Sequence, residues 1–124
     1  MDPIANMLVS IKNGYMAKKP IISVPYSKFK WQIAKVLEKE KFVGAVGKKD
    51  TLITFDLIYE NNNPKIHDIK QISKQGLRIY SKSKHIKTIK GGRGAVIIST
   101  PQGVITGKEA KNKNLGGEVI CEIW

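Results

Sequence analysis

The chain has 124 residues, and a hydrophobic content of 41% is sufficient for one domain or for two small lobes. Its 22 Lys and Arg residues exceed its 10 Asp and Glu residues, and the resulting net charge of +12 favours a polyanionic partner. The longest apolar runs have four or five residues, which excludes a membrane-spanning helix. The N-terminus lacks the regions of a signal peptide, so we expect a soluble protein that is not exported by that route.

The basic residues are unevenly distributed. Residues 1–62 carry ten basic and six acidic residues, whereas residues 63–124 carry twelve and four. Residues 69–108 contain nine basic residues and no acidic residue. A segment of this length, in which one charge sign alternates with strand-forming apolar residues, is more typical of a polyanion-binding face than of a solvated surface.

The first element is predicted to be a helix, with Asp2 as its N-cap and Pro3 at its first position. Apolar residues then recur at helical spacing and define a buried face: Ile4, Leu8, Ile11 and Tyr15. The opposite face is polar and either contacts phosphates or faces water: Asn6, Ser10, Lys12 and Asn13.

Residues 21–24 are predicted to form a strand, and Ser27 is the predicted N-cap of a second helix. The apolar side of this helix is expected to consist of Phe29, Ile33, Val36 and Leu37. Lys28, Lys30 and Lys35 are expected on its flanking faces. Lysines in a first turn oppose the helix macrodipole, a conflict that a phosphate docked at the helix start would resolve. Ordinary surface lysines are the equally weighted alternative.

Residues 42–46 and 51–59 are predicted to pair as a hairpin through a turn at residues 47–50. Alternate residues on one face are apolar: Ile53, Phe55, Leu57 and Tyr59. The asparagine-rich stretch at residues 61–64 indicates a loop, and we place the domain boundary there. The predicted domains are residues 1–62, an N-terminal α/β lobe, and residues 63–124, a mostly β lobe that binds RNA.

The second lobe is predicted to consist mainly of strands. They are expected at residues 66–72, 77–80, 95–98, 104–106 and 118–123, with a turn at residues 73–76. Residues 81–90 allow one helical turn, and residues 109–113 predict a short helical segment. The predicted fold class is therefore α+β, with two helices and three strands in the first lobe and a mostly β second lobe with a short helix.

The strands at residues 95–98 and 104–106 are joined by a tight turn at residues 100–103, where Pro101 sets φ at the second position. Ser99 and Thr100 at this tip carry small hydroxyls that both donate and accept hydrogen bonds. A polar tip beside a cationic surface indicates a place where RNA is held.

Tyr80 lies between Arg78 and Lys82 in the sequence and either stacks on an unpaired base or ribose or covers the core. The basic neighbours favour contact with RNA. The two tryptophans, Trp31 and Trp124, are expected to be packing residues.

No catalytic site is predicted. His67 and His85 belong to no metal-binding pattern and have no nearby carboxylate pair. Ser99 lacks the glycine-flanked turn of hydrolases, and the single cysteine, Cys121, has no identifiable base and is expected to be a small buried hydrophobic residue. The glycines of residues 91–94 lack the Lys-Ser/Thr that completes a phosphate-binding loop. We expect no enzyme activity, no disulfide, no metal and no cofactor.

Four segments, in the same order and over a matching length, resemble the family of the eighth protein of the small ribosomal subunit, the bacterial-type S-eight family. They are residues 2–8 (Asp-Pro-Ile-Ala-Asn-Met-Leu), residues 24–28 (Val-Pro-Tyr-Ser-Lys), residues 73–80 (Ser-Lys-Gln-Gly-Leu-Arg-Ile-Tyr), and residues 98–106 with 116–124, the C-terminal signature. Each segment alone is weakly specific, whereas the four together span essentially the whole chain.

The resemblance implies a structural constituent of the small ribosomal subunit, a primary rRNA-binding protein that docks on a helix in the central domain of the rRNA and supports subunit assembly. It implies two α+β lobes, with the C-terminal hairpin tip in the RNA minor groove. Neighbouring small-subunit proteins are further implied partners, and neither a membrane nor a small-molecule substrate is implied. The implied location is the ribosome, in a bacterial cytoplasm or an organelle. In some bacteria the family also represses translation of its own operon mRNA.

The resemblance also implies which residues contact RNA. Ser99 and Thr100 would contact bases and ribose hydroxyls, and Tyr80 with its basic neighbours would contact the backbone. Gly117 and Glu118 would lie beside the hairpin tip. The implied set is Ser99, Thr100, Pro101, Tyr80, Arg78, Lys82, Lys84, Gly117 and Glu118 in the second lobe, and Asp2, Lys12, Asn13, Ser27, Lys28 and Lys30 in the first.

The chain departs from the family pattern at several positions. Pro101 stands where the family usually has a third hydroxyl residue, so that contact is absent or made by the backbone. Asn6 replaces an acid, Gln75 replaces a common proline, and residues 85–89 replace a leucine-proline segment.

Two other classes of function fit the sequence less well. A small RNA-processing enzyme needs a titratable pair that the sequence does not provide. A protein that binds anionic membranes needs a basic amphipathic helix, which the sequence does not show.

Overall fold

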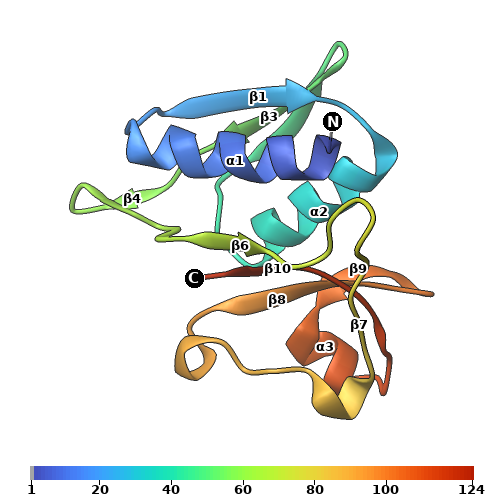
Figure 1. The fold of residues 1–124 in the computed structure, drawn as a ribbon. Coiled ribbons are helices and arrows are strands. Elements are labelled where there is room, and N and C mark those ends of the chain that lie inside the picture. The colour runs from blue at the N-terminus through green and yellow to red at the C-terminus, as the bar shows by residue number, and fades with distance from the viewer. Residues whose placement is uncertain (1) are drawn as a thin grey trace. The chain divides into compact units, whose positions relative to one another are not determined.

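The computed structural model describes residues 2–124, except for the side chain of Lys90 (Figure 1). The chain divides into two compact units, Pro3–His67 and Asp68–Trp124, and Asp2 belongs with the second. Both units combine helices with antiparallel strands, so the predicted α+β class is confirmed.

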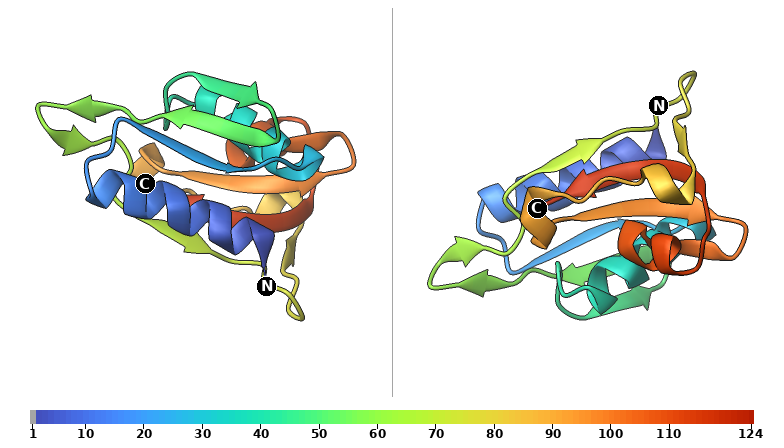
Figure 2. Two further views of the ribbon diagram at one scale, coloured as in Figure 1. Left: turned by 90° about the horizontal axis from the view of Figure 1, so that it is seen from above. Right: turned by 90° about the horizontal axis from the view of Figure 1, so that it is seen from below.

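The first unit combines helices with small antiparallel sheets. Its elements are α1 (Pro3–Met16), β1 (Ile21–Pro25), α2 (Lys28–Lys39), β2 (Val46–Lys49), β3 (Leu52–Asp56), β4 (Tyr59–Glu60) and β5 (Asn63–Pro64). Strand β3 is central in the order β1-β3-β2, and β4 pairs with β5 in a sheet of their own. Helix α1 packs along β1, as the views in Figures 1 and 2 show.

Helix α1 forms as its apolar spacing predicts, except that Ile4 is only partly buried and Met7 joins the buried face. Its interior side consists of Met7, Leu8, Ile11 and Tyr15, each at most 3% exposed. The Tyr15 hydroxyl donates to the carbonyl oxygen of Phe42 (2.6 Å) and accepts from the backbone N–H of Ile58 (3.1 Å). Burial raises the pKa of Tyr15, although the hydrogen bond from Ile58 acts in the opposite direction. This one side chain therefore fastens two loops to the helix.

Helix α2 has the predicted cap but not the whole predicted apolar face. The Ser27 Oγ accepts a hydrogen bond from the backbone N–H of Lys30 (3.2 Å), which confirms the N-cap. Ile33 and Leu37 are fully buried, but Phe29 is 37% exposed, so its predicted place in the core is wrong. Lys30 is buried instead, because it is three and seven residues before Ile33 and Leu37 and shares their face.

The β2–β3 hairpin is present, but its turn lies later than predicted. Residues 47–49 pair as a strand, and the turn is formed by Asp50 and Thr51. Asp50 adopts φ +56°, a left-handed conformation that aspartate tolerates better than most residues, and this favours a two-residue turn there. The predicted alternation is confirmed by the burial of Ile53, Phe55 and Leu57.

The asparagine-rich stretch is the turn of a small hairpin inside the first unit. Strand β4 pairs with β5 around Asn61 and Asn62, both of which have positive φ. The first compact unit ends at His67, a few residues after the predicted boundary. Local pairing therefore keeps this loop with the elements that precede it.

The second unit is built around one long C-terminal strand. Its elements are β6 (Ile69–Gln71), β7 (Tyr80–Ser81), the 3₁₀ turns η1 (Ser83–His85) and η2 (Lys90–Gly92), β8 (Ala95–Thr100), β9 (Gly103–Thr106), α3 (Gly107–Asn112) and β10 (Gly117–Ile123). The strand order is β6-β10-β8-β9, and β7 also pairs with β10. Helix α3 packs against β8 and β9 (Figure 2).

The strand predicted at residues 77–80 is mostly wrong, because only Tyr80 lies in β7. Lys74 and Leu77 instead close a loop through two mutual backbone hydrogen bonds of 2.9 and 3.0 Å. Gly76 has φ +82° in this loop, a conformation that glycine adopts without a steric penalty. The chain therefore leaves the edge of β10 after Ile72, turns at this loop and returns to the same edge at Ile79, so that β6 and β7 run in the same direction.

The core of the second unit gathers around Ile86, Val96, Ile98 and Ala110. Cys121 is fully buried in β10, and desolvation raises the pKa of its thiol to about 12. A thiol with this pKa is uncharged and unreactive at neutral pH, as expected for a packing residue.

Candidate nucleic-acid interface

Strand β10 brings together three candidate residues that are distant in the sequence. Glu118 pairs with Ser99 of β8 on one side and with Tyr80 of β7 on the other (Figure 1). Directly paired residues of antiparallel strands place their side chains on the same face. Tyr80, Glu118 and Ser99 therefore form a continuous line across three strands, which we call the three-strand row.

Both ends of the three-strand row are available to a partner. The Tyr80 side chain is 69% exposed, although it is large and aromatic. Ser99 is partly exposed, and its hydroxyl makes no hydrogen bond with any residue of the described chain. An exposed ring can stack on a base, and an unbonded hydroxyl can donate to or accept from a ribose or a base edge.

The middle of the row is occupied by an ion pair. Arg78 Nη1 lies 3.2 Å from Glu118 Oε2, and the two side chains are 50% and 21% exposed. Such partly exposed pairs contribute about 1 kcal/mol or less to stability. The arginine also offsets the negative charge of the carboxylate at this point of the row.

The hairpin tip uses its two hydroxyl residues differently. The Thr100 Oγ1 donates to the carbonyl oxygen of Gly103 (2.8 Å) and accepts from the backbone N–H of Gln102 (3.1 Å). Thr100 is only 9% exposed, whereas Pro101 is exposed at the turn. Thr100 therefore shapes the tip, and Ser99 is the hydroxyl that faces outward.

Two glycines let the strands of the row approach closely. A Cβ atom on Gly117 would overlap the carbonyl oxygen of Ser99, and one on Gly116 would lie 2.7 Å from the carbonyl oxygen of Ser81. Both glycines also line an open hollow of about 580 Å³ beside Tyr80 and Lys82. The aromatic side chain of Tyr80 and the basic side chain of Lys82 therefore both line this hollow.

The basic candidates of the second unit lie on its surface. Lys82 and Lys84 are exposed on either side of the start of η1. Basic side chains near an exposed ring attract the phosphate backbone without reading the sequence.

The candidates of α2 differ in exposure. Lys28 is exposed and follows the Ser27 cap, as expected. Lys30 was expected on a flanking face but is 6% exposed, so the structure does not present it to a partner. The lysine available at the start of this helix is therefore Lys28.

The candidate residues near the N-terminus differ in exposure and in hydrogen bonding. Asn13 is exposed on α1, whereas Lys12 is partly buried. The Asp2 carboxylate accepts a hydrogen bond from Gln71 Nε2 (2.9 Å). This bond gives Asp2 a structural contact besides any role toward RNA.

Ser73 is a functional candidate that the sequence assigned only to a turn. It is 4% exposed, and its Oγ accepts from the backbone N–H of Ile79 (2.9 Å) and donates to the Ile79 carbonyl oxygen (3.3 Å). The same carbonyl accepts from the backbone N–H of Val119 in β10 (2.8 Å). A serine before a glycine-containing turn is the only sequence signal for these hydrogen bonds between Ser73 and Ile79, and it is weak.

The described chain gives no sign of other site chemistry. Within residues 2–124, no group of three or more His, Cys, Asp and Glu side chains is placed to hold a metal ion. Across the same residues, no helix combines the length and the apolar character needed to cross a bilayer. Both histidines are exposed.

Comparison with known proteins identifies the family. The model of the family described as Ribosomal protein S8 matches residues 2–124. The small ribosomal subunit protein uS8 of Wigglesworthia glossinidia brevipalpis is 45% identical over 125 residues, which cover 98% of this chain and 96% of that protein. The uS8 proteins of Roseiflexus castenholzii and Finegoldia magna are 43% and 42% identical, over 99% of this chain and 97% and 98% of theirs. The chain therefore belongs to the ribosomal protein S8 family, of the bacterial type, and it is a structural ribosomal protein and not an enzyme.

Proposed function

We propose that the protein docks on a helix in the central domain of small-subunit rRNA and supports the folding of that RNA during subunit assembly. The three-strand row carries this proposal. It joins an exposed ring, a paired carboxylate and an unbonded hydroxyl, and two of its three residues, Tyr80 and Ser99, lie in the basic segment, residues 69–108. RNA binding is thereby assigned chiefly to the second of the two lobes, residues 63–124, and in a lesser part to residues 1–62.

The row suits the minor groove of an RNA helix. A-form RNA has a wide, shallow minor groove that displays ribose 2′-hydroxyls and base edges. Ser99 Oγ would bond to these groups, and the Tyr80 ring would pack on a ribose or on an unpaired base at an irregular step. Thr100 would act by holding the tip in shape, and Pro101 would contribute only backbone atoms or surface contact.

The lysines and arginines supply attraction rather than selectivity. Residues 69–108 hold nine basic residues without an acid, and Lys28 adds a cation on the first unit. Phosphate contacts of this kind position a protein on RNA and release counterions. Selectivity would then depend on the row, and overall affinity on the charge.

The finer assignments extend the same proposal. Neighbouring small-subunit proteins would contact other faces of the molecule. The bacterial relatives favour a ribosome in bacterial cytoplasm over one in an organelle. A hairpin of the same form in the mRNA of its own operon would bind the row as well, and the protein would then repress its own translation.

The test is filter binding of the whole protein to a central-domain rRNA fragment and to a scrambled hairpin of equal length, at several salt concentrations. We expect a preference of about a hundredfold for the native fragment, equivalent to about 2.7 kcal/mol. Both affinities should fall steeply with salt. Equal affinity for both RNAs, or binding that does not respond to salt, would contradict the proposal.

A further inference from the structure

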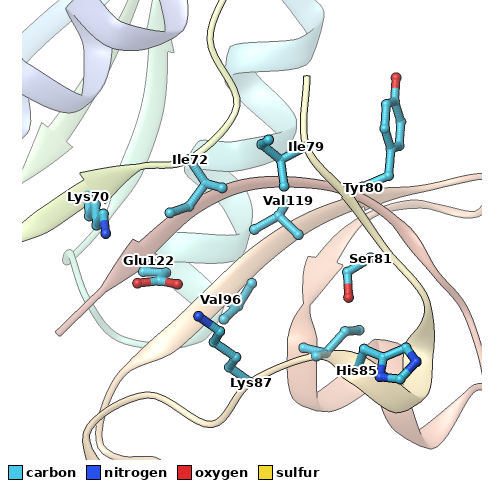
Figure 3. A pocket seen from close by; sticks show the side chains of 11 residues that line it. Lys70, Ile72, Ile79, Tyr80, Ser81, His85, Lys87, Val96, Val119 and Glu122 are labelled. Atoms are coloured by element: carbon cyan, nitrogen blue, oxygen red, sulfur yellow. The ribbon is translucent and has the colours of Figure 1, made fainter. Parts of the chain in front are cut away.

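A pocket of about 300 Å³ lies within the second unit, beside the three-strand row but largely separate from it (Figure 3). Strands β7, β8 and β10 and the residues around Ile72 form one side, and residues 85–87 form the other. This volume is at the lower end of the range for small-molecule sites. A compact ligand is therefore the class of occupant that it fits.

The interior of the pocket is aliphatic. Its apolar lining consists of Ile72, Ile79, Ile86, Val96 and Val119. Ile86 and Val96 are buried in the core, whereas Ile79 is 37% exposed and Ile72 and Val119 are partly exposed. A ligand with an apolar body would remove this surface from water, at a gain of about 25 cal/mol for each Å².

One end of the pocket carries charged groups. Lys70 is the cross-strand neighbour of Glu122, and Lys87 extends toward both from the opposite wall (Figure 3). None of these three side chains forms an ion pair within 4.0 Å in the part of the chain that the structure describes. Two ammonium groups on exposed lysines face one carboxylate, so this end has a net positive charge.

The other end is polar. Ser81 and His85 lie there (Figure 3). The pocket therefore has a cationic end, an aliphatic middle and a polar end. This order of properties matches a molecule with an anionic head and an apolar body.

We propose that this pocket binds a small amphipathic carboxylate, with its apolar body against the five aliphatic side chains and its carboxylate between Lys70 and Lys87. Charge-assisted hydrogen bonds from the two ammonium groups would orient the head. Glu122 lines the same end of the pocket and would repel a second negative charge, and so a monoanion fits better than a dianion. Of the residues that line the pocket, only Tyr80 also belongs to the three-strand row.

The experiment uses three probes with the same apolar chain and different heads: octanoate, octan-1-ol and octyltrimethylammonium. Each is titrated into the whole protein, and methyl NMR signals report the dissociation constant and the site. We expect octanoate to bind most tightly, with shifts at Ile72, Ile79 and Val119. The signal of Ile53, which is fully buried in the first unit, should remain unchanged.

Variants of matched type separate the pocket from general surface charge. Lys87→Met keeps the aliphatic reach and should weaken octanoate binding roughly tenfold while leaving octan-1-ol unaffected. Lys84→Met is the control, because Lys84 is exposed three residues earlier and does not line the pocket. Glu122→Gln should act in the opposite direction and tighten octanoate binding, because it removes the like charge.

Several results would overturn the proposal. Equal affinity for octanoate and octan-1-ol would remove the role of the lysines, and shifts spread over both units would remove the site. Equal losses in Lys87→Met and Lys84→Met would show attraction to surface charge only. RNA is absent throughout, so the outcome is independent of the rRNA proposal.

Discussion

Ser73 stabilises the segment that leads into the three-strand row. Its hydroxyl makes both hydrogen bonds with Ile79, the residue before Tyr80, and the Ile79 carbonyl is also bonded to β10. Most other contacts of the loop are exposed, since Leu77 and Tyr80 are 62% and 69% exposed. The buried hydroxyl of Ser73 thus fixes the backbone from which the exposed Tyr80 ring extends.

Ser73→Ala is expected to weaken binding to the central-domain rRNA fragment about tenfold and to lower the free energy of unfolding by about 1 kcal/mol, the usual contribution of a hydrogen bond. Binding assays and denaturant unfolding measure the two effects. In a double-mutant cycle with Tyr80→Ala, the second substitution should add little, because Ser73 acts through Tyr80. Fully additive losses would contradict this positioning role.

The buried thiol of Cys121 is expected to make the free energy of unfolding depend on pH in the alkaline range. Its pKa is raised by burial to about 12 in the folded protein, against 9.0 for an unperturbed thiol. The unfolded chain therefore loses this proton first, and the stabilisation is complete below pH 9 and is lost progressively from there toward pH 12. Each pH unit in this window should cost about 1.4 kcal/mol relative to Cys121→Val, which cannot titrate. Parallel pH profiles of the two proteins would contradict the assignment.

At the scale of elements, close strand approach depends on Gly117. A side chain there would meet the backbone of Ser99, which cannot move without disturbing the β8–β10 pairing. Gly76 also has an unusual conformation, but a Cβ atom there would meet nothing within 4 Å. A substitution at Gly117 therefore tests steric overlap, whereas a substitution at Gly76 tests backbone strain.

We expect Gly117→Ala to lower the free energy of unfolding by roughly 2–4 kcal/mol and to disturb the row. Gly76→Ala should cost only about 1–2 kcal/mol, the penalty for placing a Cβ atom in a left-handed conformation. Urea unfolding measures both values. Similar costs at the two sites would argue against the close approach.

The variant Tyr15→Phe tests whether the Tyr15 hydroxyl holds two loops of the first unit against α1. Tyr15→Phe keeps the ring but leaves the carbonyl of Phe42 and the N–H of Ile58 without their partner. The expected loss is roughly 1–3 kcal/mol in the free energy of unfolding, since partly buried polar groups lose their hydrogen bonds. Tyr59→Phe is a milder comparison, because the Tyr59 hydroxyl donates its hydrogen bond to the carbonyl oxygen of Lys19 (2.7 Å), an exposed interaction just after the end of α1. If Tyr15→Phe lowered the free energy of unfolding by less than Tyr59→Phe does, this role of Tyr15 would be contradicted.

Local sequence patterns predicted the helices and the two hairpins, β2–β3 and β8–β9, but not the pairing of strands that are distant in the sequence. The Ser27 cap and the spacing that buries Leu8 and Ile11 involve only neighbouring residues, and the structure confirms them. The meeting of Tyr80, Glu118 and Ser99 depends on pairing between distant strands, which local patterns cannot specify. The resemblance to a family implied that Gly117 and Glu118 lie beside the tip, as the pairing of Glu118 with Ser99 confirms, but it supplied neither the pairing with Tyr80 nor the bonds that occupy Thr100.

At the scale of the whole molecule, charge and geometry are expected to make separable contributions. The net charge of +12 should give a slope of log affinity against log salt of about −0.7 to −0.9 for each of about five to eight phosphates. Lys82→Met should reduce the slope by about one such contact and weaken native and scrambled RNA alike. An unchanged slope would place Lys82 away from the RNA.

The most direct test of the central claim, that the three-strand row reads the RNA, is the affinity ratio for native over scrambled RNA in Ser99→Ala. The account predicts that this ratio falls about tenfold or more while the salt slope stays as in the unmodified protein. Lys82→Met, measured alongside, should keep the ratio and change the slope. An unchanged ratio in Ser99→Ala would mean that selectivity resides elsewhere on the protein.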